Sequence, residues 1–166
     1  MKRMIKWLVW IPVILMMITI FGFSNANSEK SSSLSGSFIY DTLNFVDGTF
    51  SLQLDQQEKN RLVEALQTPI RKMAHMTEYM VLAITLMFAL YVDGLKNKKM
   101  VAIAALIGIA YAALDEFHQL FVPGRSGEIR DVCVDTIGIL IGIGIFLLLL
   151  KLYNYISYKR KKVGRI

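Results

Sequence analysis

The stretch Y-A-A-L-D-E-F-H-Q-L-F-V-P-G-R-S-G-E-I-R-D-V-C-V-D-T-I-G, residues 111–138, decides the fold of this chain. It holds the densest cluster of ionisable residues in the second half, and apolar runs at 100–114 and 132–150 flank it. Carboxylates within membrane-spanning sequence are energetically costly unless they have partners. The flanking runs therefore predict membrane helices, and the acidic residues between them predict a functional site.

Composition supports a membrane protein. The chain has 166 residues, enough for one domain, and 54% of them are hydrophobic. They come in blocks, which is typical of spanning helices rather than of a soluble core. The net charge is +6, but the basic residues stand at the ends of apolar blocks. We therefore expect them to orient the spans in the membrane, and we expect no nucleic-acid partner. The single cysteine, Cys133, excludes an internal disulfide and a cysteine-cluster metal site.

The segment between the first two apolar runs is polar and predicted to lie outside the cytoplasm. Leu34, Phe38 and Phe45 fall at near-helical spacing, and Asp47-Gly48 predicts a turn. Asp55 followed by Glu58 resembles a capping box that opens another short helix. We expect these amphipathic helices to lie on the membrane surface or to cap the bundle.

The second span is predicted to begin at Thr68-Pro69, with Thr as N-cap and Pro in the first turn. Val122-Pro123-Gly124 is expected to end the third. The fold expected is an all-α integral membrane four-helix bundle, with short amphipathic helices in the extracytoplasmic 24–70 segment. It forms a single domain over 1–166, with spans at about 7–23, 70–92, 100–121 and 129–153, an outer segment at 24–68 and a basic tail at 154–166.

The N-terminal segment has two interpretations. A basic start at 1–6, an apolar run at 7–23 and the small residues Ser24-Asn25-Ala26 resemble a signal peptide with its cleavage site. The apolar run is longer than the usual core of a signal peptide, which favours a retained first span. Lys and Arg gather at 1–6, in the turn 96–99 and after residue 150, so both termini are expected in the cytoplasm of a multi-pass protein.

Polar residues of the second span share one face, since Arg71, His75 and Glu78 recur at helical spacing. Lys72 and Tyr79 form a neighbouring stripe. In the third and fourth spans the acidic residues are also near the outer end. The groups that share a face there are Tyr111, Asp115, His118 and Gln119, with Glu116 a quarter-turn away, and Asp131, Asp135, Gly138 and Gly142.

Three spans thus place acids and bases at one depth near the outer surface, which predicts a shared pocket. The two glycines of the fourth span would let another helix approach closely, and Gly142 or Gly144 could also serve self-association in a homo-oligomer. Cations on the same ends balance much of the acidic charge, as a buried cluster requires.

Three functions remain open for this pocket. The first is recognition of an anionic lipid headgroup by basic residues and helix N-termini: Arg71, Lys72, Arg125 and Arg130, with the backbone of Gly124. The second is a membrane-embedded hydrolase or transferase, with catalytic candidates His75, Glu78, Asp115, Glu116, His118 and Asp135. A divalent metal is its candidate cofactor, with His75, Glu78, Asp115, His118 and Asp135 as candidate ligands. The third is a small proton-coupled transporter. Tyr79, Gln119 and Asp131 are assigned to the surrounding polar network.

Three motifs in order resemble the VanZ-like family: R-K-x-x-H-x-x-E-Y at 71–79, D-E-x-H-Q-x-F-x-P-G-R at 115–125 and D-x-x-x-D-x-x-G at 131–138. F-G-F-S at 21–24 adds to the resemblance. Members of that family are small integral membrane proteins of bacteria, and the founding member is associated with resistance to glycopeptides, particularly teicoplanin. The resemblance implies a place in the bacterial plasma membrane and a role at the cell envelope. A lipid-linked cell-wall precursor or a glycopeptide-related ligand is the partner it implies.

Overall fold

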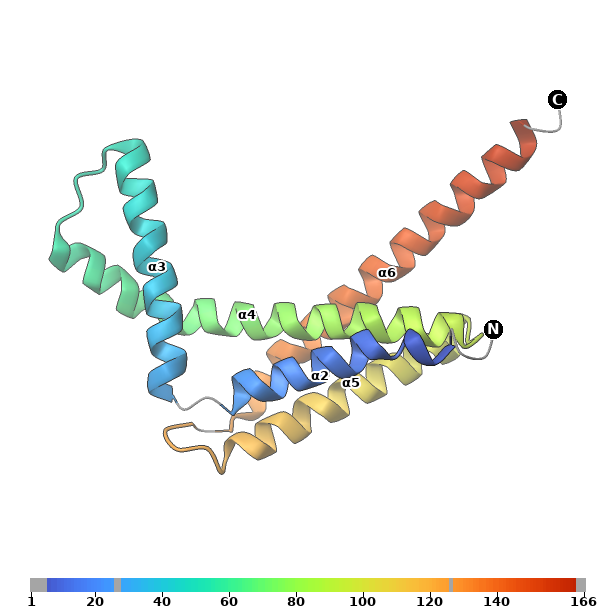
Figure 1. Cartoon of the computed structure of the whole chain (residues 1–166), viewed down its shortest axis with the longest axis horizontal. Coiled ribbons are helices and arrows are strands. Elements are labelled where there is room, and N and C mark those ends of the chain that lie inside the picture. The colour runs from blue at the N-terminus through green and yellow to red at the C-terminus, as the bar shows by residue number, and fades with distance from the viewer. Residues whose placement is uncertain (1–5, 26–27, 126, 164–166) are drawn as a thin grey trace.

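The computed structural model describes residues 6–25, 28–125 and 127–163, and within them it contains five α-helices and no strand (Figure 1). Four of these helical stretches are long and apolar enough to cross a membrane, which confirms the all-α fold with four spans. The basic residues at 1–5, Ala26 of the cleavage-like motif and Arg165 lie outside the described residues. The helices are α2 (Ile11–Ser24), α3 (Ser28–Phe50), α4 (Gln56–Val92), α5 (Asn97–Gln119) and α6 (Ile129–Val163).

The helices α2, α4 and α5 pack along one another, while α6 crosses α4 and then diverges from it (Figure 1). The α3 helix lies across one end of this bundle, at a steep angle to the others (Figure 1). The α5–α6 connection lies at that same end, which we call the α3 end. The start of α2, the α4–α5 turn and the last part of α6 lie at the opposite end (Figure 1).

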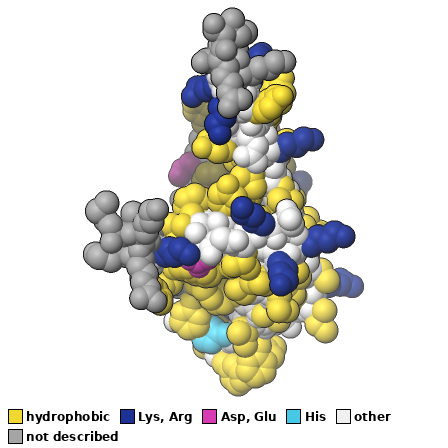
Figure 2. Space-filling view, turned by 90° about the vertical axis from the view of Figure 1, so that its right-hand side faces the viewer, with side chains coloured by type: hydrophobic (Ala, Val, Ile, Leu, Met, Phe, Trp, Pro, Cys, Tyr) yellow, Lys and Arg dark blue, Asp and Glu magenta, His cyan; other side chains and the backbone are white. Residues whose placement is uncertain are grey.

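The opposite end is rich in basic side chains, and Figure 2 shows Lys and Arg spread across it. Here Trp10 Nε1 donates a hydrogen bond of 2.9 Å to Asp93 Oδ2, which joins α2 to the α4–α5 turn. The exposed cations of this end and of the adjoining part of α6 are Lys96, Lys98, Lys99, Lys151, Lys159, Arg160 and Lys161. The last of them belong to α6, which continues as a helix to Val163 where the sequence predicted a separate tail from residue 154.

The prediction of short helices in the outer segment was wrong, because α3 is one long helix that runs through Asp47-Gly48. Thr42 and Thr49 donate their hydroxyl hydrogens to carbonyl oxygens four residues earlier, so these side chains are satisfied within the helix, although such bonds do not stabilise it. Ile39 is buried, so tertiary packing supplies what the polar composition lacks. The chain turns at Ser51 and Gln53, which have positive φ.

The predicted helix start at Thr68-Pro69 was also wrong, since Pro69 lies inside α4. The capping box at Asp55 and Glu58 begins this helix instead, with both of its hydrogen bonds formed. A proline inside a helix removes one backbone hydrogen bond and bends the helix. Accordingly, the first turns of α4 run at an angle to the remainder (Figure 1).

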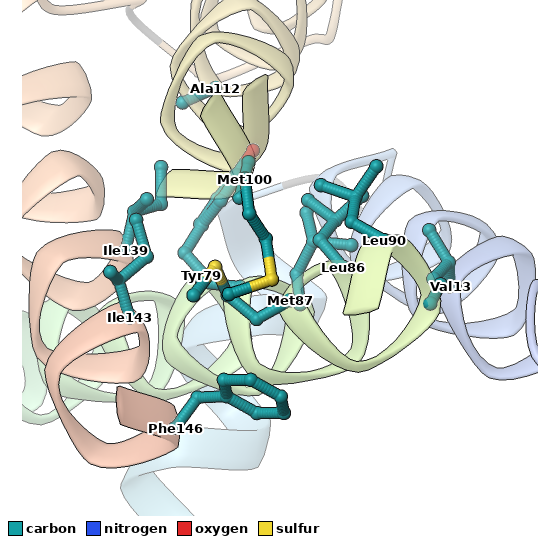
Figure 3. Packing of buried hydrophobic residues seen from close by; sticks show 14 of the residues in the cluster. Val13, Tyr79, Leu86, Met87, Leu90, Met100, Ala112, Ile139, Ile143 and Phe146 are labelled. Atoms are coloured by element: carbon teal, nitrogen blue, oxygen red, sulfur yellow. The ribbon is translucent and has the colours of Figure 1, made fainter. Parts of the chain in front are cut away.

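The core lies between α2, α4, α5 and α6, and the labelled side chains of Figure 3 come from these four helices. Two glycines of α6 set how closely it packs on α4, as their spacing predicted. A Cβ at Gly138 would lie 2.1 Å from the backbone oxygen of Met76, and one at Gly142 would lie 2.3 Å from that of Met80. Only glycine fits this crossing, so the α4–α6 contact brings the polar start of α6 against Lys72 and His75. Gly142 therefore serves the contact between α4 and α6 within this protein.

Candidate functional site

The polar side chains near the α3 end come from four segments of the chain: the end of α2, the middle of α4, the end of α5 with its following loop, and the start of α6. Of their two close ion pairs among the described residues, one joins two helices and the other lies within α4. Lys72 of α4 forms an ion pair with Asp131 of α6. His75 Nδ1 lies 3.3 Å from Glu78 Oε2, one helical turn along α4. The three predicted polar faces thus meet around α4.

Gln119, at the end of α5, connects the acids of that helix to the following loop. Its Nε2 donates to Asp115 Oδ2 at 3.3 Å and to Glu116 Oε1 at 3.4 Å. Its Oε1 accepts from Arg125 Nη1 at 3.5 Å, while Arg125 Nη2 donates to the backbone oxygen of Phe23 at 3.2 Å. A neutral amide therefore separates the guanidinium from two buried carboxylates. The backbone N–H of Glu128 donates to the other oxygen of Glu116, which closes the loop.

Arg125 lies outside the spanning helices but is partly enclosed by them. Burial lowers the pKa of its guanidinium, and the neighbouring Arg71 lowers it further, while Asp115 and Glu116 oppose this change. Arginine keeps its proton throughout the physiological range even so. Arg71 and Arg125 are therefore two positive charges held near each other, an arrangement that an anion would stabilise.

Two cavities open at this end of the bundle. A polar cavity of about 160 Å³ lies between α4, the α5–α6 connection and the start of α6. A second cavity, of about 300 Å³, lies between the end of α2, α3 and α4 and has apolar walls. Arg71, His75 and Arg125 line both of them. The remaining residues of the polar cavity are Thr68, Lys72, Glu116, Gln119, Gly124, Glu128 and Asp131.

Beneath the cavities lies a layer of buried polar side chains. Ser24 and Tyr79 are fully buried; the Ser24 hydroxyl interacts with the Asp115 carboxylate, whereas the Tyr79 hydroxyl has no hydrogen-bond partner among the described residues. Asp135 is also buried and interacts electrostatically with His75. This layer joins the site to the core, where the ring of Tyr79 lies 6.3 Å from that of Tyr111.

The predicted site residues differ in how they participate. His118 lies to one side: its Nε2 is 3.4 Å from Asn25 Oδ1, and its ring lies 4.7 Å from that of Phe21. Arg130 is exposed and lines neither cavity, although Gly124 lines the polar one. The five candidate metal ligands do not converge, since no group of three His, Cys, Asp or Glu in the described part of the chain could hold a metal ion.

The sequence did not indicate the residues that form the apolar walls. Phe23, Leu34, Phe38, Ile70 and Ala74 come from three helices, and α3 contributes two of them. The spacing of Leu34 and Phe38 was the available signal, but it revealed only an apolar face and not what that face adjoins.

These features define an all-α protein with four helices of membrane-spanning length and a polar site near one end of the bundle. The family model for VanZ/LLP1 matches residues 9–150, so the chain belongs to that family, as its three motifs predicted. No match was found among curated proteins or among solved structures.

Proposed function

We propose that this protein recognises the anionic headgroup of a lipid at the outer face of the bacterial plasma membrane. The observation that carries the proposal is the polar cavity, in which Arg71, His75 and Arg125 converge from two segments far apart in the sequence. Arg125 is held in place by Gln119 and by the backbone of Phe23, so one part of the binding surface is pre-organised. Two guanidinium groups can bind a phosphate through charge-assisted hydrogen bonds.

The depth of the site suits a lipid headgroup. At about 1.5 Å per residue, His75 lies roughly 25 Å and Arg71 roughly 32 Å along α4 from Val92. The hydrocarbon core of a bilayer is about 30 Å thick. With Val92 at one boundary, Arg71 reaches the headgroup layer on the other side, and His75 lies just beneath it.

The sidedness follows from the positive-inside rule. Exposed Lys and Arg are spread over the end opposite to α3 (Figure 2), and such clusters favour the cytoplasm. Both termini then face the cytoplasm and the site faces outward. An outward site suits a role at the cell envelope, and the resistance that the VanZ name implies would follow if the bound lipid were one that a glycopeptide also contacts. A lipid-linked cell-wall precursor meets that description.

Binding of a fluorescently labelled phosphatidic acid to the purified protein in maltoside micelles tests the proposal. We expect Arg71→Ala and Arg125→Ala each to weaken binding about tenfold or more, because a hydrogen bond to a charged group contributes about 1.5–3 kcal/mol. Arg130→Ala is the matched control, because this arginine belongs to the same end but lines neither cavity. If all three variants bind equally well, the cavity is not the headgroup site and the proposal fails.

The cellular counterpart concerns resistance. We expect Arg125→Ala to abolish protection against teicoplanin while the abundance of the protein in the membrane is unchanged. Full protection by this variant would separate the site from resistance.

A further inference from the structure

The apolar cavity next to the headgroup site has a composition that a headgroup does not need. Its floor is charged, formed by Arg71, His75 and Arg125 together with Glu78. Its walls are aromatic and aliphatic and come from α2, α3 and α4. A soluble anion would use the floor alone. The walls match a hydrocarbon chain attached to the anion.

The two cavities are continuous in their lining, since Arg71, His75 and Arg125 face both. A ligand whose phosphate contacts these residues therefore has an apolar channel beginning at its own position. We infer that this cavity holds the hydrocarbon chain of the ligand, and that the ligand arrives sideways from the outer leaflet past α3. This inference rests on the proposed function and adds the class of ligand: an anionic amphiphile of the membrane, not a soluble phosphate.

The position of α3 supports lateral access. The helix crosses the bundle at a steep angle (Figure 1), as a helix lying along a membrane surface does. Leu34 is 57% exposed and Phe38 63% exposed, and Phe23 on the opposite wall is 51% exposed. The side chains that form these walls are thus largely accessible from outside the protein. His75 lies just beneath the headgroup layer, so exposed apolar side chains beside it border on the outermost part of the acyl chains.

The hydrocarbon chain of the ligand is expected to orient the bound lipid rather than to add a large gain in hydrophobic energy. A chain that moves from the bilayer into an apolar cavity exchanges one apolar environment for another, because lipid tails are as apolar as leucine side chains. The hydrocarbon chain instead keeps the phosphate of the lipid at the depth of the two arginines and limits the direction from which that phosphate approaches. This makes the cavity a determinant of which anions bind.

Photo-crosslinking in nanodiscs tests the inference with a phosphatidic acid that carries a diazirine in its acyl chain, diluted into phosphatidylcholine. We expect labelling of peptides containing Leu34 and Phe38 to exceed several-fold the labelling at Leu106 and Leu148, which are also exposed and report general contact with lipid. The same diazirine on phosphatidylcholine should label all four positions similarly. Arg71→Ala should remove the excess at α3 and leave the labelling at Leu106 unchanged.

A plug variant provides the second arm. Ala74 lines the apolar cavity and is exposed, so Ala74→Phe should fill the cavity without disturbing the core, and we expect it to reduce the α3 labelling at least threefold. Ala65→Phe is the control, because Ala65 is exposed on the same helix and lines neither cavity.

The outcomes separate the two proposals. If Arg71→Ala weakens headgroup binding but the wild-type protein shows no excess labelling at α3, headgroup recognition stands. The inference that the apolar cavity holds the hydrocarbon chain is then overturned. If neither labelling nor binding depends on the charge at position 71, both are overturned.

Discussion

Substitution of Gly138 by alanine tests the contact that assembles the site. A Cβ at this position would lie 2.1 Å from the backbone oxygen of Met76, whereas ordinary contacts begin at 3.4 Å. Because the opposing atom belongs to the backbone, no rotamer change relieves the clash, and α6 must move away from α4 by about 1 Å. Overpacking of this kind costs about 1–3 kcal/mol. The same movement would pull Asp131 away from Lys72, so we also expect weaker headgroup binding.

Thermal unfolding of the purified protein in detergent measures the effect. For a protein of this size, 1–3 kcal/mol corresponds to a decrease in Tm of roughly 2–12 °C. Gly144→Ala is the matched control on the same helix, because its Cβ would meet nothing within 4 Å and alanine favours the helix over glycine. We expect this control to be neutral or slightly stabilised. If Gly138→Ala unfolds at the same temperature as Gly144→Ala, α4 and α6 are not in backbone contact and the reasoning is refuted.

Three further predictions concern side-chain interactions. The hydrogen bond from Lys59 holds the pKa of Asp47 below its ordinary value. The stabilisation it gives α3 is present above the pKa of the unfolded chain and lost as the pH falls through the folded value. The protection of α3 amides against hydrogen exchange, relative to the intrinsic rate at each pH, should therefore fall in acid in the wild type but not in Asp47→Asn. Removal of the acceptor of Trp10 by Asp93→Ala should destabilise the protein by about 1–2 kcal/mol in denaturant titration, whereas Asp93→Asn should lose less. Gln119→Glu places a third carboxylate next to the two acids of α5 and in contact with the guanidinium, and we expect at least tenfold weaker binding of phosphatidic acid; unchanged affinity would show that the amide does not position that guanidinium.

The spans were predictable because their signals are local and strong. Long apolar runs, the capping box at Asp55 and the glycine face of α6 each specify structure over a few turns. The convergence of acids and bases was also predictable, since helical spacing and span orientation together place Arg71 and Asp131 at one end.

The outer segment was harder, because its structure depends on contacts between residues far apart in sequence. The composition of α3 is polar, and its helix is stabilised by packing of Ile39 and by bonds such as that from Lys59 to Asn44. Pro69 shows the same limit: a proline in the first turn of a helix and one that bends a helix in its interior have the same local sequence signature. The apolar walls of the second cavity could not be foreseen, since they depend on where α3 crosses the bundle.

Native mass spectrometry of the protein released from nanodiscs gives the most direct test of the central claim that Arg71 and Arg125 form one site for an anionic lipid. Nanodiscs of phosphatidylcholine with a minor fraction of phosphatidic acid would supply the ligand. The account predicts that the wild-type protein and Arg130→Ala retain a single phosphatidic acid molecule, and that the Arg71→Ala, Arg125→Ala double variant retains none above the level of phosphatidylcholine. Equal retention by the double variant and the wild type would contradict the account.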